Sequence, residues 1–356
     1  MRITQRLSVI LLTAAFAWSQ ARPQTAALEG MDPVLLTEGK EMPGNEALTL
    51  KHGRFTYQFT SEDTRERFRK DPARYGIQLD GACARMGPPV GASKDAYFVY
   101  ENRIYVFGSD DCYKRFSANP DKYLESKQPK EPWNPTPATL KQGQALLKKA
   151  LDAMGGAAQW EAVRSYMETR RRSTPRGDQV TTMTVRLPDS FRNETAMGER
   201  SFGGLITPAG KYNVFGGEGV AVPESFGQAM LNEWRRDLLP LLLSRNTNGF
   251  DVHYAGRSGD ADLLVVNNQG VFSTLLLDPA TGQITAIKSR GRGPDGFGEF
   301  RIAYSDYREA GGFKLPFRAE THFAGEPVPQ RNWAVDSYQF NPPDLDAKFQ
   351  VKIVER

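Results

Sequence analysis

The spacing of apolar residues after position 139 predicts one helix followed by a long series of strands. Leu147, Ala150, Leu151 and Met154 recur at the helical period, and Gly155 follows them as a natural C-cap. Beyond this helix the period changes to two, which is typical of strands that bury one face. We expect strands at residues 180–187, 191–195, 211–215, 261–266, 271–277, 283–289, 300–307 and 333–340.

One long helix is predicted to interrupt these strands at residues 225–245. Its apolar positions form a wide stripe at helical spacing, so the helix is expected to lie against the sheet. These positions are Met230, Leu231, Trp234, Leu238, Leu241 and Leu242. Consecutive strands joined by tight turns, of which residues 278–282 are the clearest, predict a curved antiparallel sheet with helices on its concave side.

The part before residue 128 contains an internal repeat at a spacing of 48 residues. Each copy has a short alternating aromatic strand, a serine that can cap a helix, a helical Phe and a Pro-x-x-Tyr end. The matching residues are Tyr57, Phe59, Ser61, Arg67, Phe68, Pro72 and Tyr75 in the first copy and Tyr105, Phe107, Ser109, Arg115, Phe116, Pro120 and Tyr123 in the second. Because each unit is too small to bury its own apolar face, we expect the two units to pack as one domain.

A proline-rich segment at residues 128–138 separates these two parts. Four prolines between residues 128 and 137 disfavour helix and strand and favour an extended connector. The predicted layout is therefore a duplicated strand–helix domain at 30–127, a linker, and an antiparallel β domain at 139–356. The predicted fold class is α+β, with a small duplicated unit and a curved half-barrel sheet covered by helices.

The repeat resembles the YHS domain over residues 30–125. The upstream segment of that family is mirrored by Asp32-Pro33-Val34-Leu35 in the first copy and by residues 80–86, which end in Met86, in the second. The resemblance implies metal binding, of copper especially, in an accessory module. The family usually has a second cysteine at the position that Gly108 occupies here, so the implied ligand set is incomplete.

The second part resembles the outer-membrane lipoprotein carriers and related periplasmic proteins. The likeness is carried by residues 150–156, by the turn at 277–282, by residues 305–308 with 314–317, and by the closing residues 341–343. The resemblance implies an acyl chain shielded between sheet and helices. The six apolar residues of the predicted helix 225–245 are then the candidates to line an apolar-ligand site.

The N-terminus predicts export. Arg2 and Arg6 precede an apolar run at residues 7–18, and small residues then allow cleavage after Ala21. The run is shorter than the roughly 20 residues that a membrane span needs, and the mature chain has no other candidate span. The expected location is therefore the periplasm or the exterior.

Charge argues against a nucleic-acid partner. Without Arg2 and Arg6 the formal net charge falls from +4 to +2, and the one basic run is Arg170-Arg171-Arg172. This run lies in a predicted strand, so we interpret it as a solvated face.

Cys83 and Cys112 are the only cysteines, and both belong to the second copy of the repeat. One interpretation is a disulfide, which an exported protein can keep and which would stabilise a loop of about 30 residues by roughly 3–4 kcal/mol. The other is a soft-metal site for Cu(I), formed by the two thiolates with the Met86 thioether as a candidate third ligand. Both interpretations remain open at the level of sequence.

No catalytic constellation is evident. His52, His253 and His322 lack ligand spacing, and no zinc-protease motif or nucleophile elbow is present. We therefore expect an exported, non-enzymatic binding protein of the cell envelope that holds an apolar or acyl ligand. The alternatives are copper handling through Cys83 and Cys112 and docking to another envelope protein.

Overall fold

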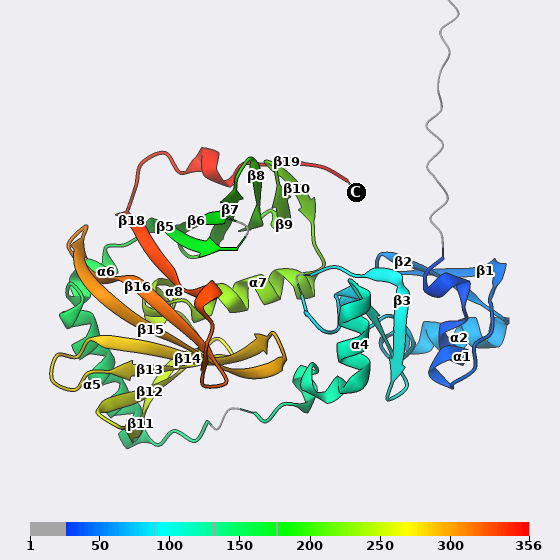
Figure 1. Cartoon of the computed structure of the whole chain (residues 1–356), viewed down its shortest axis with the longest axis horizontal. Helices are drawn as coiled ribbons and strands as arrows, with labels where there is room; N and C mark the ends of the chain where they lie inside the picture. Colours follow the sequence, from blue (N-terminus) through cyan, green and yellow to red (C-terminus); the bar gives the residue numbers. More distant parts are fainter. Residues whose placement is uncertain (1–25, 89, 131–132, 176, 356) are drawn as a thin grey trace, which may run out of the picture.

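The computed structural model describes residues 26–88, 90–130, 133–175 and 177–355. The chain has the predicted α+β architecture, with an N-terminal module (residues 28–127) ahead of a larger sheet domain (residues 137–353) (Figure 1). The predicted signal peptide, residues 1–21, lies outside the described residues. Within the described ranges no helix is long and apolar enough to cross a membrane.

Each unit of the N-terminal module is a β-hairpin followed by a helix. The first unit consists of α1 (Pro33–Thr37), β1 (Asn45–His52), β2 (Phe55–Phe59), α2 (Glu62–Lys70) and α3 (Pro72–Tyr75). The second consists of β3 (Ser93–Tyr100), β4 (Arg103–Phe107) and α4 (Asp110–Ala118). Sequence analysis identified β2, α2, β4 and α4 but missed β1 and β3, because neither of those strands has a fully buried side chain.

The predicted serine caps are present in both units. The Ser61 hydroxyl accepts a hydrogen bond from the Thr64 backbone N–H at 3.2 Å, and Ser109 accepts one from Cys112 N–H at 3.3 Å. These bonds satisfy N–H groups that the first helical turn leaves without a partner.

Strand β4 joins the two units because both of its faces are buried. Tyr105 and Phe107 pack with α4 in the core of the second unit. Ile104 and Val106, on the opposite face, belong to the core of the first unit. The two units therefore pack against one shared strand.

The described part of the sheet domain is built on one sheet of 15 strands. Their order is β11-β12-β13-β14-β15-β16-β18-β5-β6-β7-β8-β9-β10-β19, and β17 pairs with β16. Pairing is antiparallel except between the short strands β10 and β19. The long strand β18 lies beside β5, so the last long strand of the chain pairs with the first strand of the domain.

The strands have the following bounds: β5 (Ser165–Thr174), β6 (Gly177–Arg186), β7 (Ser190–Met197), β8 (Arg200–Thr207), β9 (Gly210–Phe215), β10 (Glu218–Ala221), β11 (Phe250–Ser258), β12 (Ala261–Asn268), β13 (Val271–Leu277), β14 (Ile284–Gly293), β15 (Gly296–Ala310), β16 (Phe313–Phe323), β17 (Glu326–Pro327), β18 (Trp333–Phe340) and β19 (Lys352–Ile353). Each of the eight predicted strands coincides with an observed one, and β13 and β18 match to the residue. Strands β8 and β16 were missed because Gly203, Gly204 and Pro316 interrupt their alternation.

Four helices pack their apolar faces into the core of the sheet domain. They are α5 (Pro137–Ala153), α6 (Ala157–Glu161), α7 (Glu224–Arg236) and α8 (Leu238–Leu243). Helix α7 runs between the two arms of the curved sheet (Figure 1). Helix α5 begins within the predicted linker, at Pro137, and buries Leu147, Ala150 and Leu151 as expected.

The helix predicted at residues 225–245 is two helices. Asp237 has an extended conformation, with φ −69° and ψ 152°, and separates α7 from α8. Pro240 explains the break, because its ring would clash with the carbonyl of Arg236 in a continuous helix. The break turns Asp237 toward β5.

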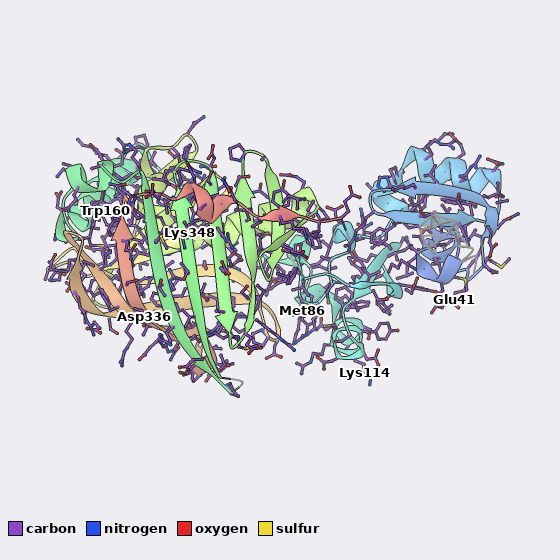
Figure 2. All side chains as sticks on the ribbon, turned by 90° about the horizontal axis from the view of Figure 1, so that it is seen from above. Glu41, Met86, Lys114, Trp160, Asp336 and Lys348 are labelled. Carbon is purple, nitrogen blue, oxygen red and sulfur yellow. The ribbon has the colours of Figure 1, made fainter. Side chains whose placement is uncertain are left out.

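The second unit of the N-terminal module lies against one end of the sheet domain. Met86 is at this junction, whereas Glu41 of the first unit lies on the far side of the module (Figure 2). The module therefore extends the long axis of the molecule and covers one end of the sheet domain.

Candidate functional site

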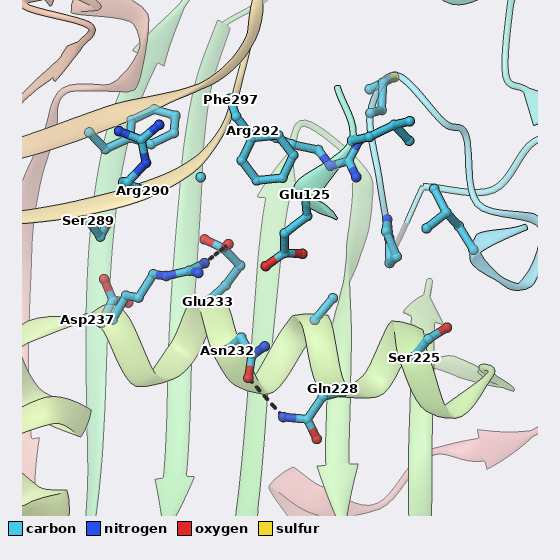
Figure 3. Close-up of a pocket in the computed structure, with 18 of the residues that line it drawn as sticks. Glu125, Ser225, Gln228, Asn232, Glu233, Asp237, Ser289, Arg290, Arg292 and Phe297 are labelled. Atoms are coloured by element: carbon cyan, nitrogen blue, oxygen red, sulfur yellow. Dashed lines mark hydrogen bonds and ion pairs between the residues drawn. The ribbon is translucent and has the colours of Figure 1, made fainter. Parts of the chain in front are cut away.

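A cleft of about 930 Å³ lies where the second unit of the N-terminal module meets the sheet domain. Its walls come from the second unit, from helix α7, and from the sheet side, where strands β5, β14, β15, β16 and β18 and the 3₁₀ helix at residues 329–331 contribute (Figure 3). The volume is within the roughly 300–1,000 Å³ that is usual for small-molecule sites. Its position between two parts of one chain is also typical of ligand sites.

Helix α7 contributes its polar face to the cleft. Ser225, Gln228, Asn232, Glu233 and Arg236 line it, at the spacing of three and four residues that places side chains on one side of a helix. The Gln228 amide donates a hydrogen bond to the Asn232 carbonyl oxygen at 2.8 Å, which orients both side chains (Figure 3). The opposite face of α7 is packed in the core.

The sheet wall combines aromatic side chains with arginines. Phe297 and Phe300 on β15 and Trp333 on β18 supply apolar surface. Arg331 belongs to the short 3₁₀ helix η6 (Pro329–Arg331), and its guanidinium lies 5.1 Å from the centre of the Phe300 ring. This wall offers both apolar contact and positive charge.

Arg292 on β14 connects the sheet wall to the N-terminal module. Its Nη1 donates a hydrogen bond to the Ala84 carbonyl at 2.7 Å, and its guanidinium lies 4.9 Å from the centre of the Phe297 ring. Burial lowers the pKa of Arg292 to about 10, so it stays a cation at neutral pH. The module is thus held by a buried charge rather than by surface contacts alone.

Further polar contacts cross the same junction. Arg85 donates to the Pro294 carbonyl at 2.8 Å, and Arg115 forms a 3.2 Å ion pair with Asp295. Ser225 at the start of α7 donates a hydrogen bond to the Asp80 carboxylate. The glycine-rich segment 291–296 forms the end of the β14–β15 hairpin, and it is part of this contact.

Arg170 contacts two residues that line the cleft, Asp237 and Trp333, and was missed by sequence analysis. The expectation of a solvated face holds for Arg171, whose side chain is 48% exposed, and is wrong for Arg170, which is 14% exposed. Because side chains alternate along β5, Arg170 shares the inner face with Glu168, which accepts two of its hydrogen bonds at 2.6 and 3.0 Å. Burial raises the pKa of Glu168, and the adjacent Arg170 opposes that rise. The signal available in the sequence was the Glu-x-Arg spacing of two residues.

The six apolar residues predicted to line a ligand site lie in the core of the sheet domain. Trp234 stacks near Phe191 with ring centres 5.5 Å apart, and its Nε1 donates to the Tyr166 hydroxyl at 3.3 Å. None of the six is among the residues that line the cleft described here. The six predicted residues are Met230, Leu231, Trp234, Leu238, Leu241 and Leu242. The cleft therefore lies on the polar side of α7, and these six residues lie in the core or pack against it.

Cys83 and Cys112 are neighbours in the second unit, and both are free thiols. The predicted disulfide is thus not formed, although the two side chains are close enough to share a hydrogen bond. Burial raises the pKa of Cys83. Burial would also raise the pKa of Cys112, but hydrogen bonds with Ser109, Cys83 and Arg85 outweigh it, and the pKa of this thiol is lowered.

Met86 does not complete a soft-metal site with these thiols. Its side chain is 46% exposed and lines the cleft. Within the described residues no group of three or more His, Cys, Asp or Glu side chains is placed to hold a metal ion.

Comparisons with known proteins find similarity at the level of solved structures. No protein-family model matches the chain, and no curated protein matches it. A putative outer membrane lipoprotein-sorting protein domain from Vibrio parahaemolyticus is 8% identical, with a TM-score of 0.35 over 59% of this chain and 97% of that one. A LolA superfamily protein from Nitrosomonas europaea is 10% identical, with a TM-score of 0.33 over 58% and 97%. A DUF1329 family protein from Desulfovibrio piger is 12% identical, with a TM-score of 0.30 over 58% and 96%.

Proposed function

We propose that this chain is an exported, non-enzymatic binding protein of the cell envelope that holds a partly apolar ligand in the cleft. The observation that carries the proposal is the 930 Å³ cleft between the second unit and the sheet domain. Aromatic side chains on one wall and polar side chains on another are the usual composition of a ligand site. The envelope location rests on the predicted signal peptide.

The N-terminal module has a structural part in this proposal. Leu79, Tyr105 and Leu124 of the second unit contribute to the cleft lining. The module therefore completes the binding site, and a sheet domain without it would offer an open surface. An acyl chain is one ligand that would fit such a cleft, as the carrier resemblance implies.

Copper handling is not favoured by the geometry. Cys83 and Cys112 supply two thiols, but Met86 points its side chain into the cleft and Gly108 occupies the position of the family's second cysteine. Two ligands fall short of the set that most protein metal sites use.

Native mass spectrometry of the mature protein, purified without detergent, tests the proposal directly. We expect a co-purifying small molecule that is released on unfolding. A binding assay with N-phenyl-1-naphthylamine, a neutral apolar fluorophore, provides a second test, because its emission rises in apolar sites. Ala229 on α7 lines the cleft, so Ala229→Trp should fill it and reduce probe affinity at least tenfold.

The matched control is Ala118→Trp, at an exposed position at the end of α4. It adds the same side chain outside the cleft and should leave probe affinity unchanged. Equal affinity of the Ala229→Trp variant and the unaltered protein would refute the cleft as the binding site.

A further inference from the structure

The charges that line the cleft do not balance. Six arginines and three carboxylates line it. Two of the carboxylates are already engaged: Glu233 pairs with Arg236 at 2.5 Å, and Asp237 pairs with Arg170 at 3.3 Å. The lining thus contains more arginines than carboxylates.

Two of these arginines, Arg172 and Arg331, lie near each other. Arg172 is on the inner face of β5, and η6, which carries Arg331, packs against that strand. Arg172 donates to the Gln179 side-chain oxygen, and Arg331 lies over Phe300. Among the described residues, no carboxylate lies within ion-pair distance of either guanidinium. Burial and the neighbouring Arg331 charge both lower the pKa of Arg172.

The backbone at Arg331 is held in place. The Thr321 hydroxyl donates to the Arg331 carbonyl at 3.1 Å, and the Thr321 backbone N–H donates to the Asn332 side-chain oxygen at 2.8 Å. Two like charges near each other repel, so a fixed arrangement of this kind is stabilised by an anion between them. Arginine is suited to this role because its planar guanidinium can bind a carboxylate or phosphate through two parallel hydrogen bonds.

Apolar surface adjoins the two arginines. Phe300, Ile302 and Trp333 line the same side of the cleft. A small inorganic anion would leave these side chains without a contact, whereas an amphiphile would place its head at the arginines and its tail along the aromatic wall. The arrangement favours an amphiphile with an anionic head over a small inorganic anion.

We propose that the ligand of the cleft is an anionic amphiphile whose carboxylate or phosphate head is bound between Arg172 and Arg331. This inference rests on the proposed function, since it assigns the ligand class of the same cleft. It also names the two residues that select that class.

A displacement assay tests the inference with four probes of defined chemistry. Decanoate, decyl phosphate, neutral 1-decanol and inorganic phosphate are titrated against protein loaded with N-phenyl-1-naphthylamine, and isothermal titration calorimetry follows inorganic phosphate. We expect decanoate and decyl phosphate to bind at least tenfold more tightly than decanol. The Arg172→Gln, Arg331→Gln double variant should lose this preference and keep its affinity for decanol.

Two further variants separate charge from structure. Arg172→Lys with Arg331→Lys retains both charges but not the planar geometry, and should restore part of the preference for anions. Arg171→Gln removes the neighbouring charge on the opposite face of β5, where Arg171 pairs with Asp336 at 2.9 Å, and should leave all affinities unchanged.

The outcomes distinguish this inference from the proposed function. Equal binding of decanol and decanoate, both blocked by Ala229→Trp, would overturn the anionic head group and leave the binding function standing. Binding of inorganic phosphate alone, lost in the double variant, would support an anion site and overturn the amphiphilic ligand. Absence of binding by all four probes would overturn both.

Discussion

Arg170 of β5 and Asp237 of the α7–α8 junction form an ion pair, with 3.3 Å between Nη1 and Oδ2. Glu168 binds the other side of the same guanidinium, and the Trp333 ring lies 4.3 Å from it. Since Asp237 and Trp333 both line the cleft, this network connects the break in the helix to the sheet beneath the proposed ligand. The break at Asp237 therefore helps to form the site.

Removing the arginine from this network should strongly destabilise the fold. Arg170→Met leaves the Glu168 carboxylate, which is 1% exposed, without its partner. We expect the free energy of unfolding to fall by about 3–5 kcal/mol, as for other broken buried ion pairs. Urea unfolding followed by circular dichroism measures this change.

Two variants serve as controls for that prediction. Arg171→Met breaks an exposed pair and should cost less than about 1 kcal/mol. Glu168→Gln combined with Arg170→Met removes both charges and should cost less than Arg170→Met alone. If Arg170→Met and Arg171→Met lose equal stability, the network has no structural role.

The two thiols should differ in reactivity in the reduced, folded protein. The pKa of Cys112 is lowered and that of Cys83 is raised, and the thiolate is the reactive form. Iodoacetamide should therefore label Cys112 first, as mapped by peptide mass spectrometry. Arg85 lies 3.9 Å from the Cys112 sulfur, so Arg85→Gln should slow this labelling severalfold. Arg115→Gln, on the same helix as Cys112, should not slow this labelling. Identical labelling rates for the two cysteines would contradict the assignment.

Tyr57 should make stability depend on pH above 10. Burial raises its pKa to about 12, and its hydroxyl accepts a hydrogen bond from Ile77 N–H at 3.0 Å. The phenol of the unfolded chain ionises first, with a pKa near 10, so this contribution is complete below pH 10 and is lost as pH rises toward 12. Between pH 10 and pH 12 this residue lowers the free energy of unfolding by at most about 1.4 kcal/mol per pH unit.

Comparison with Tyr57→Phe isolates this effect from other tyrosines. At pH 7 the variant should be less stable by about 1 kcal/mol, because the Ile77 N–H loses its acceptor. The difference should shrink or reverse by pH 11, because only the unaltered protein loses the Tyr57 contribution. Exposed Tyr113→Phe should follow the unaltered protein. Parallel stability curves for Tyr57→Phe and the unaltered protein would count against the prediction.

The elements that the sequence predicted are those that have a local signal. The aromatic alternation of Tyr57 and Phe59 and the serine cap at Ser61 identify β2 and α2 without any tertiary information. The break in the long helix was also readable, since Pro240 forbids a continuous helix through Asp237. Strand β8 is the opposite case. Gly203 and Gly204 interrupt its alternation, so its sequence does not indicate a strand, and pairing with β7 in the sheet maintains it.

The cleft could not be predicted in the same way. Arg172, Asn232 and Arg292 lie on three separate elements and look like ordinary solvated positions in the sequence. Periodicity shows that a helix has a polar face but not whether that face is opposed by another part of the chain. The apolar stripe of residues 230–242 was predicted to lie against the sheet, and its residues lie in the core or pack against it.

Docking of the N-terminal module should depend on Arg292. Its Nη1 bonds to the Ala84 carbonyl, and its Nε is 2.5 Å from where a side-chain carbon at Gly87 would lie, so the guanidinium fits closely against residues 84–87. Arg292→Gln cannot reach this carbonyl and removes the charge over Phe297. We expect the module to separate more often from the sheet domain, with faster proteolysis of the connector at residues 128–136 and a larger radius of gyration in small-angle X-ray scattering.

Arg115→Gln is the matched control, because it breaks the exposed pair with Asp295 across the same junction and should have little effect. Because the second unit forms one wall of the cleft, Arg292→Gln should also weaken N-phenyl-1-naphthylamine binding, and unchanged proteolysis and binding together would show that the module docks without this arginine.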